Sequence, residues 1–186
     1  LISATAAVIT QIPASVMDAG YATTTAASIA SLYLFIAIPG KLILGHIYDR
    51  YGVKAGILFG NTMFLLSVIC LIFIKHQPLL YLMAILFGFG TCIGTVSAPV
   101  ITSGIFGTKH YAEIYGFLSL FPSVGYALGG PLIASAYDLT GSYNIAWIIV
   151  AVLAIVMTAF LLYSYRVSRM CIKEQEETGN TAKIAV

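Results

Sequence analysis

The chain has 186 residues, of which 60% are hydrophobic and only 9% are charged, and its formal net charge is +2. Soluble globular domains carry about 25% charged residues, and a small domain leaves much of its surface in water, so this composition excludes a soluble domain. Uncharged runs reach the ~20 residues that a helix needs to cross a bilayer, and they lack the alternating pattern of membrane β-strands. We predict an all-α, multi-pass integral membrane protein surrounded by the lipid bilayer.

Six apolar stretches separated by turn residues predict six membrane spans. In chain order they are Leu1–Met17, Ala22–Gly45, Ala55–Ile74, Leu79–Ile105, Ala112–Ala136 and Tyr143–Ser164. We expect residues 1–165 to form one membrane domain. The remainder, 166–186, mixes charges of both signs and lacks aromatic residues, which predicts a disordered tail. The chain opens within an apolar stretch that has neither a basic region nor a cleavage site, so we expect no signal peptide and expect a longer protein upstream.

The basic residues predict the orientation. With six crossings, alternate loops share a side, and one side receives Lys41, Arg50, Lys54, Lys109, Arg166, Arg169, Lys173 and Lys183. The other side receives only Lys75. Cytoplasmic loops carry the excess of Lys and Arg, so we expect the loop after the second span, the loop at Lys109 and the C-terminus to be cytoplasmic. The sequence leaves open which membrane holds the protein.

Nothing in the sequence predicts an enzyme, a cofactor or a nucleic-acid partner. The histidines His46, His76 and His110 lie in loops on opposite faces of the membrane and cannot converge on a metal ion. Cys70 and Cys92 lie within spans, so we expect no disulfide framework. No nucleophile–base pair and no phosphate-binding glycine loop is evident.

The loop between the second and third spans, GHIYDRYGVK, is the most informative segment. Gly45 is small enough for a close approach to a neighbouring helix. Asp49 is suited to accept hydrogen bonds at a helix N-terminus, and Arg50 and Lys54 lie at the level of anionic headgroups. Gly52 permits the positive φ of a tight reversal. Any short cytoplasmic hairpin can hold such residues singly, but their joint spacing between two spans is rare.

This loop resembles the signature G-x-x-x-D-[RK]-x-G-[RK]-[RK] of the major facilitator superfamily, and it departs from that signature at Val53, where the family usually has a basic residue. Residues 106–116 and 129–143, the latter with the run G-P-x-x-x-x-x-x-D-x-T-G-S-Y, resemble the C-terminal half of the monocarboxylate-transporter and oxalate/formate-antiporter branch. The resemblance implies that the chain is a six-helix half, helices seven to twelve, built as a 3+3 inverted repeat. A partial repeat, Tyr48-Asp49-x-x-Gly52 and Tyr137-Asp138-x-x-Gly141, fits that arrangement.

The resemblance also implies which helices face a substrate path, namely the first, second, fourth and fifth of each half. The candidate cavity-lining residues on these spans are Gln11, Ser31, Tyr33, Thr91, Thr95, Ser123 and Tyr126. For the Ser and Thr hydroxyls the alternative is a local hydrogen bond to a carbonyl one turn back. The long polar tips of Gln11 and Tyr126 cannot be satisfied so locally. Helix packing, or alternatively helix bending, explains Gly90, Gly94, Gly125, Gly129 and Pro131.

The leading functional hypothesis is a secondary transporter that moves small molecules, such as monocarboxylates or other organic anions, by alternating access between two six-helix halves. The loop Gly45–Lys54 would act in the cytoplasmic gate with Asp49 as its electrostatic latch. No basic residue lies deep in the second or fifth span, so either the N-terminal half, on the same chain if this is a fragment, supplies a charge or the substrate is neutral. The alternative is a non-transporting scaffold, sensor or partner-binding protein with the same fold.

Overall fold

The structure is a computed structural model that describes the backbone of residues 2–107 and 110–184, and the side chains of these residues apart from 2–4, 6, 105, 106, 126 and 165–184. Its elements are α1 (Ile2–Asp18), α2 (Thr23–Ile72), α3 (Gln77–Phe106), α4 (Tyr111–Thr140) and α5 (Tyr143–Ile184). No strand occurs in these ranges, so the prediction of an all-α protein is confirmed. Among the described residues, the four helices α2 to α5 are long and apolar enough to cross a membrane.

Helix α2 contains both the second and the third expected span. A straight helix of its 50 residues would be about 75 Å long, far more than a bilayer requires. Gly52 interrupts it with φ 81° and ψ 174°, which folds α2 into a hairpin of a first segment (23–51) and a second segment (53–72). We expected the first helix of this pair to end at Gly45. It continues to residue 51 instead, because intrahelical hydrogen bonds do not require apolar side chains.

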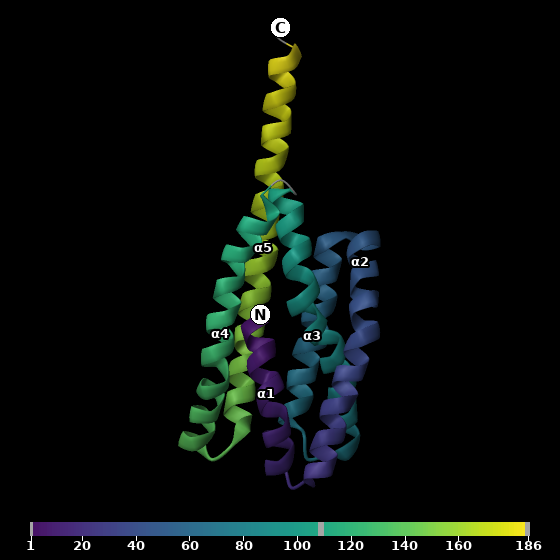
Figure 1. Cartoon of the computed structure of the whole chain (residues 1–186), viewed down its shortest axis with the longest axis vertical. Coiled ribbons are helices and arrows are strands. Elements are labelled where there is room, and N and C mark those ends of the chain that lie inside the picture. Colours follow the sequence, from purple (N-terminus) through teal and green to yellow (C-terminus); the bar gives the residue numbers. More distant parts are fainter. Residues whose placement is uncertain (1, 108–109, 185–186) are drawn as a thin grey trace.

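The helices form a single bundle, shown in Figure 1, with α2 and α3 on one side and α1, α4 and α5 on the other. The most extensive contact is between α2 and α3, while α1 packs mainly on α4, and α5 packs mainly on α2. The hairpin tip of α2, the end of α3, the start of α4 and the extension of α5 lie at one end of the bundle, at the top of the view (Figure 1). The other connections lie at the opposite end.

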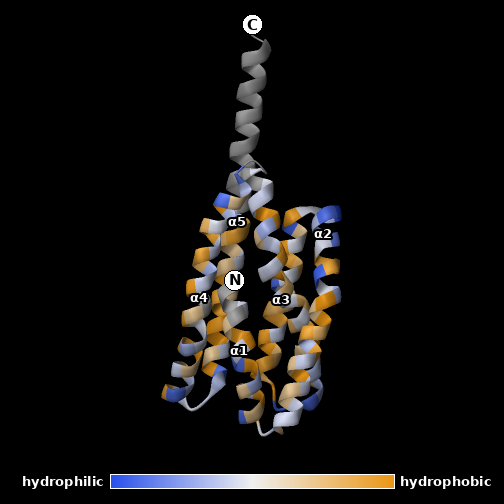
Figure 2. Ribbon diagram, in the orientation of Figure 1, coloured by the Kyte–Doolittle hydropathy of each residue, from blue (hydrophilic) through white to orange (hydrophobic). Residues whose placement is uncertain are grey.

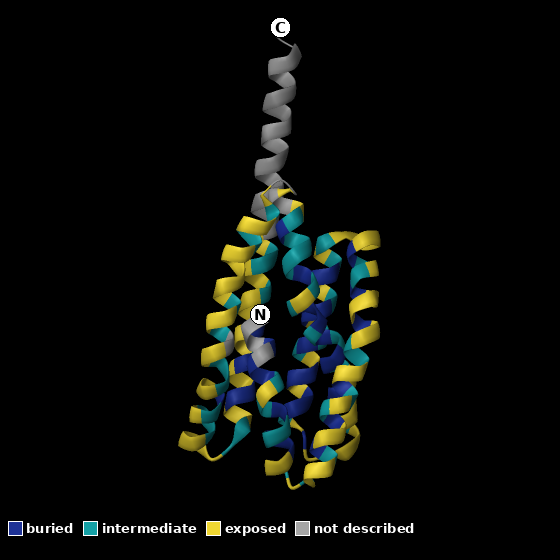
Figure 3. Cartoon of the chain, viewed as in Figure 1, coloured by how far each residue is buried: buried dark blue, intermediate teal, exposed yellow. Residues whose placement is uncertain are grey.

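The core of the bundle lies where α1, α2, α3 and α5 meet, and α4 remains largely outside it. Trp147 of α5 and Phe64 and Phe87 of the α2–α3 contact are fully buried. By contrast, only 6% of the most apolar stretch of α4 is buried, and Figure 3 shows α4 mostly in the colour of exposed residues. Figure 2 shows that hydrophobic residues predominate along the helices of the bundle, and many large apolar side chains such as Phe35 and Phe160 are exposed, as expected of helices that contact lipid.

The C-terminal segment belongs to helix α5 in the structure, and its expected disorder in solution stays a prediction. Helix α5 continues to Ile184, so residues 166–184 are helical in the structure. This stretch contains Lys, Glu, Gln, Met and Arg, which have high intrinsic helix propensity, and a preceding span of the same helix removes the cost of nucleation.

Two glycines set the distance between α3 and the two segments of α2. A Cβ atom added to Gly88 would lie 2.8 Å from the carbonyl oxygen of Tyr33 in the first segment. A Cβ added to Gly90 would lie 2.7 Å from the backbone N and Cα of Phe64 in the second segment. Small residues permit such close approach of helices in membranes, so α3 is held tightly between both arms of the hairpin.

This packing predicts opposite effects for two glycine substitutions in α3. Gly90→Ala should lower the free energy of unfolding by about 1–3 kcal/mol, because the new methyl group meets backbone atoms that cannot move aside. Gly104→Ala is the matched control, since nothing lies within 4 Å of its added Cβ and Ala favours a helix over Gly by up to about 1 kcal/mol. Thermal unfolding of the complete protein in detergent measures both, and equal losses would contradict the close contact.

Candidate functional site

The reversal at the tip of the α2 hairpin depends on Gly52. Its φ of 81° with ψ of 174° falls in a region of backbone conformation that is essentially restricted to glycine. The predicted positive φ at this position is therefore confirmed. Nothing lies within 4 Å of a Cβ added to Gly52, so the backbone conformation, and not a lack of space, requires glycine here.

The charged residues of the loop point away from the bundle. Asp49 and Arg50 are exposed in the last turn of the first segment, and Lys54 is exposed in the first turn of the second. The Arg50 guanidinium lies 5.9 Å from the centre of the Tyr51 ring. Within the part of the chain that the structure describes, the Asp49 carboxylate has no hydrogen-bond or ion-pair partner.

Asp49 does not cap a helix within this loop, and the expected latch toward a helix end in the second half stays a prediction. The residue lies at the C-terminal end of the first segment and not at a helix N-terminus, because the helix continues past Gly45. A negative charge near a helix C-terminus is disfavoured by roughly 0.3–1 kcal/mol, the reverse of its effect at an N-terminus. Asp49 is thus an exposed carboxylate in an unfavourable position.

Gly45 also has a different environment from the one expected. No atom lies within 4 Å of a Cβ added to Gly45, so the predicted close approach to a neighbouring helix does not occur within the described chain. The close approach occurs earlier in the same segment, at Gly40, whose added Cβ would lie 2.9 Å from Sγ of Cys92. Gly45 leaves an open surface beside the hairpin tip.

Tyr48 anchors the hairpin tip, a role that the sequence analysis missed. Its side chain is 5% exposed, and its hydroxyl donates a hydrogen bond of 2.5 Å to Oγ of Ser97 in α3. A Cβ added to Gly56 would lie 2.6 Å from the Tyr48 ring, so the ring also lies against the second segment. The available signal was the partial repeat, in which Tyr48 and Tyr137 occupy the same place beside an aspartate.

The candidate cavity-lining hydroxyls bond locally, as the alternative interpretation proposed. Ser31, Thr95 and Ser123 are exposed, and Thr91 is half-buried. The four hydroxyls donate to the carbonyl oxygens of Ala27, Cys92, Ser119 and Gly88, at 3.1, 3.2, 2.9 and 3.1 Å. Each donor faces a carbonyl three or four residues earlier on its own helix. The lone pairs of the hydroxyl oxygens remain as acceptors.

The larger polar candidates have different environments from one another. Tyr33 is 3% exposed and its ring packs edge-on against Phe87 at 5.2 Å, so it belongs to the core and does not line an open surface. Gln11 bonds to other helices, with Nε2 donating to the Gly130 carbonyl oxygen at 3.4 Å and Oε1 accepting from the Tyr143 hydroxyl at 3.5 Å. The side chain of Tyr126 lies outside the described residues.

The candidate packing and bending residues divide by helix. Gly90 of α3 is explained by packing, through its contact with Phe64. Gly94, Gly125 and Gly129 are half-buried. Pro131 is exposed inside α4, which continues as a helix to Thr140. Bending at these positions stays a prediction.

A second polar cluster joins α1, α4 and α5 at the end of the bundle opposite the hairpin tip. The Tyr137 hydroxyl donates a hydrogen bond of 2.6 Å to Oδ1 of Asp18. The Tyr137 ring stacks on Tyr143 with ring centres 4.4 Å apart, and Tyr143 in turn stacks on Trp147 at 5.9 Å. This cluster connects Gln11 to the end of α1 through neighbouring aromatic rings.

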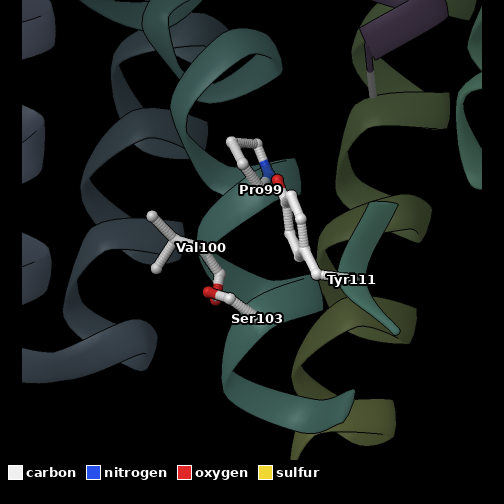
Figure 4. Close-up of a pocket in the computed structure, with 4 residues that line it drawn as sticks. All are labelled: Pro99, Val100, Ser103 and Tyr111. Carbon is white, nitrogen blue, oxygen red and sulfur yellow. The ribbon is translucent and has the colours of Figure 1, made fainter. Parts of the chain in front are cut away.

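A hollow that the sequence did not predict opens between the end of α3 and the start of α4. Its volume is about 380 Å³, and Figure 4 shows Tyr111 of α4 beside the lining residues of α3, which are Pro99, Val100 and Ser103. The lining is mainly apolar and the hollow is wide open. The described residues contain no group of three or more His, Cys, Asp or Glu side chains that could hold a metal ion.

The glycines of the loop predict a contrast in stability. Gly52→Ala should lower the free energy of unfolding by roughly 1–3 kcal/mol, because alanine is strained at φ 81°. Gly45→Ala should be neutral or slightly stabilising, because its helical site is open. Denaturant unfolding of the complete protein in micelles compares the two variants. A Gly52→Ala protein as stable as the Gly45→Ala protein would disprove the strained conformation.

Comparisons with known proteins identify the family. A sequence model described as Major Facilitator Superfamily matches residues 2–184. Monocarboxylate transporter 14 of Mus musculus is 28% identical over 136 residues, which cover 72% of this chain and 26% of the relative. Monocarboxylate transporter 12 of Homo sapiens is 27% identical over 158 residues, which cover 83% and 31%. Monocarboxylate transporter 9 of Pongo abelii is 32% identical over 110 residues, which cover 58% and 21%.

The chain therefore spans between about a fifth and a third of the length of these three relatives. No solved structure matches it significantly. The family match extends over nearly the whole chain, and the relatives bear transporter names and not enzyme names. The chain belongs to the major facilitator superfamily of membrane transporters, near its monocarboxylate-transporter branch.

Proposed function

We propose that this chain is one six-helix half of a secondary transporter that works by alternating access against a second half in the same longer protein. The family match and the transporter names of the relatives support this proposal. The exposure of α4 supports it further, because only 6% of its most apolar stretch is buried within this chain. A single helix with so few contacts has room for lipid on one face and for the second half on another.

The observation that carries the proposal is the exposed Asp49 at the hairpin tip. Its carboxylate lies at a helix C-terminal end, where the helix dipole disfavours it, and no partner lies within the described chain. A helix N-terminus or a basic side chain from the second half would neutralise this charge in one conformation and release it in the other. Asp49 would then act as the latch of a cytoplasmic gate, together with Arg50, Gly52 and Lys54.

The proposed substrates are monocarboxylates or other small organic anions. The relatives are named monocarboxylate transporters. The exposed hydroxyls of Ser31, Thr95 and Ser123 already donate to backbone carbonyls. A carboxylate only accepts hydrogen bonds, so we expect its donors to come from other groups. Lys41 is exposed on the first segment. It lies about 7 Å along the helix axis from His46 of the loop, so its long side chain can extend to the membrane surface. We expect the second half to supply a deeper positive charge.

A non-transporting scaffold, sensor or partner-binding protein is the second candidate. The observation that favours it is the absence of a basic residue deep in the described spans, since a charge at such a depth marks an ion or anion pathway. The two candidates differ in substrate flux, which a scaffold does not support.

Uptake of radiolabelled pyruvate and lactate into liposomes containing the complete protein distinguishes the two candidates. A transporter of small carboxylates should give saturable uptake that unlabelled substrate competes away, whereas liposomes without protein should not. A neutral polyol serves as a second probe, because a neutral substrate would be taken up without competition by carboxylates. The absence of saturable uptake of any probe would favour the scaffold.

Asp49→Asn should lower the maximal uptake rate roughly tenfold, because a loss of about 1.4 kcal/mol from the latch corresponds to one factor of ten. Membrane insertion should remain intact, since the exposed Asp49 side chain makes no hydrogen bond or ion pair within the described chain. Asp138→Asn is the matched control, because Asp138 is an exposed aspartate in the corresponding place of the partial repeat. Equal rates for the two variants would contradict the latch.

Epitope tags test the proposed orientation. Tags beside Arg50 and after Val186 should both be accessible only from the cytoplasm, whereas a tag at Lys75 should be accessible only from the other side, because basic loops stay inside. Antibody labelling of intact and permeabilised cells measures this. Tags at Arg50 and Val186 on opposite sides would refute the expected number of crossings.

A further inference from the structure

We propose that Tyr48 is a positioning residue that fixes the direction of the α2 hairpin tip and thereby holds Asp49 outward. The inference deepens the proposed gate and rests on the proposed function for its link to transport. Its structural part, the control of the tip by the contact between Tyr48 and Ser97, stands on the geometry alone.

The first step is the burial of the hydrogen bond. Tyr48 is 5% exposed and Ser97 is 7% exposed, and their hydroxyls are 2.5 Å apart. A buried hydroxyl that loses its partner costs more than an exposed one, which water can satisfy. The bond connects the last full turn of the first segment to α3, which the close contacts of Gly88 and Gly90 hold in place.

The second step is the fit of the ring against the other arm of the hairpin. An added Cβ at Gly56 would lie 2.6 Å from ring atoms of Tyr48, so a residue with a side chain at position 56 would displace the ring. Tyr48 therefore links its own segment of α2 both to the second segment of α2 and to α3. Gly52 joins the two arms and has no side chain that contacts its surroundings. The angle between the arms therefore depends on contacts such as those of Tyr48.

The third step follows from helix geometry. Successive residues of a helix are rotated by about 100°, so when the side chain of Tyr48 is fixed inward, Arg50 lies on the opposite face and Asp49 lies on the flank, about a quarter turn from Tyr48. Both are exposed in the structure. A tip free to rotate about Gly52 would spread the Asp49 carboxylate over many directions and weaken any latch that requires one of them.

At the opposite end of the bundle, a second tyrosine hydroxyl joins two helices by a hydrogen bond, but this bond is exposed. Tyr137, in the matching place of the partial repeat, donates a hydrogen bond to Asp18 and thereby joins α4 to α1. In a 3+3 inverted repeat, the first span corresponds to the fourth and the second span to the fifth. The contact between α1 and α4, the first and fifth spans, therefore corresponds to the contact between α3 and the first segment of α2, the fourth and second spans. Tyr48 and Ser97 join this second pair. The recurrence indicates that the tyrosine before the aspartate has a positional role in both repeats.

Hydrogen exchange of the backbone amides of residues 45–54, in the complete protein in lipid nanodiscs, tests the inference. Tyr48→Phe and Ser97→Ala should each raise exchange roughly tenfold, because each removes the same buried hydrogen bond and a loss of about 1.4 kcal/mol corresponds to a factor of ten. The double variant should exchange no faster than either single variant, since both remove the same bond. Tyr51→Phe is the matched control, because Tyr51 is 66% exposed in the same loop.

The kinetics of pyruvate uptake distinguish a positioning role of Tyr48 from a merely structural one. Tyr48→Phe should lower the maximal rate with KM unchanged, whereas Ser67→Ala, which removes a buried hydroxyl bond to the Phe64 carbonyl in the same helix, should leave both unchanged. Equal exchange in Tyr48→Phe and Tyr51→Phe would overturn the inference. If the wild-type protein shows no uptake while the exchange pattern holds, the proposed function fails and the positioning of the tip stands.

Discussion

The close contact between α3 and both arms of the α2 hairpin is the constraint on which the candidate site depends. In a bilayer, helices gain nothing from hiding apolar side chains from water, so they associate through close packing and hydrogen bonds. Gly88 and Gly90 bring the backbone of α3 against Tyr33 and Phe64. This contact places Ser97 opposite Tyr48 and so determines where the hairpin tip lies. A slippage of one turn along α3 would separate those two hydroxyls by about 5.4 Å and break their hydrogen bond.

The same packing explains why few polar side chains are left for a ligand within this chain. Hydroxyls on a membrane helix bond to carbonyls of the preceding turn, and Gln11 bonds to Gly130 and Tyr143 on two other helices. Most of the described hydroxyl donors are thus satisfied internally, and these side chains present mainly acceptor lone pairs. The exception in the core is Asn61, which is 5% exposed and whose Nδ2 and Oδ1 have no hydrogen-bond partner among the described residues. A second exception lies at the surface. Asp49 has a full charge, no partner in the described chain and an unfavourable position at a helix end.

The sequence predicted features that a single residue type or a local period determines. Composition determined the helical membrane class, and Gly52 predicted a positive φ because few other residues adopt it. The predicted end of the first segment at Gly45 was wrong. A change from apolar to polar residues marks the edge of the lipid and not the end of a helix. The pairing of Tyr48 with Ser97 joins residues 49 positions apart. Such a pairing depends on the register between two helices, which no local pattern in either helix contains.

The two ends of the bundle use related contacts in different surroundings, and the difference has a physical consequence. The hydroxyl bond of Tyr48 is buried, so no water can replace Ser97 and opening the contact costs the unpaired groups their full desolvation penalty. The bond between Tyr137 and Asp18 is exposed, so water can take the place of either partner at little cost. Opening the Tyr48–Ser97 contact at the hairpin end therefore costs more free energy than opening the Tyr137–Asp18 contact at the other end. The α1–α4 pair does not depend on that exposed bond alone, because Gln11 of α1 also donates to a backbone carbonyl of α4. The two helix pairs are thus held together by different means, one by a single buried bond beside close glycine contacts and the other by several weaker polar contacts.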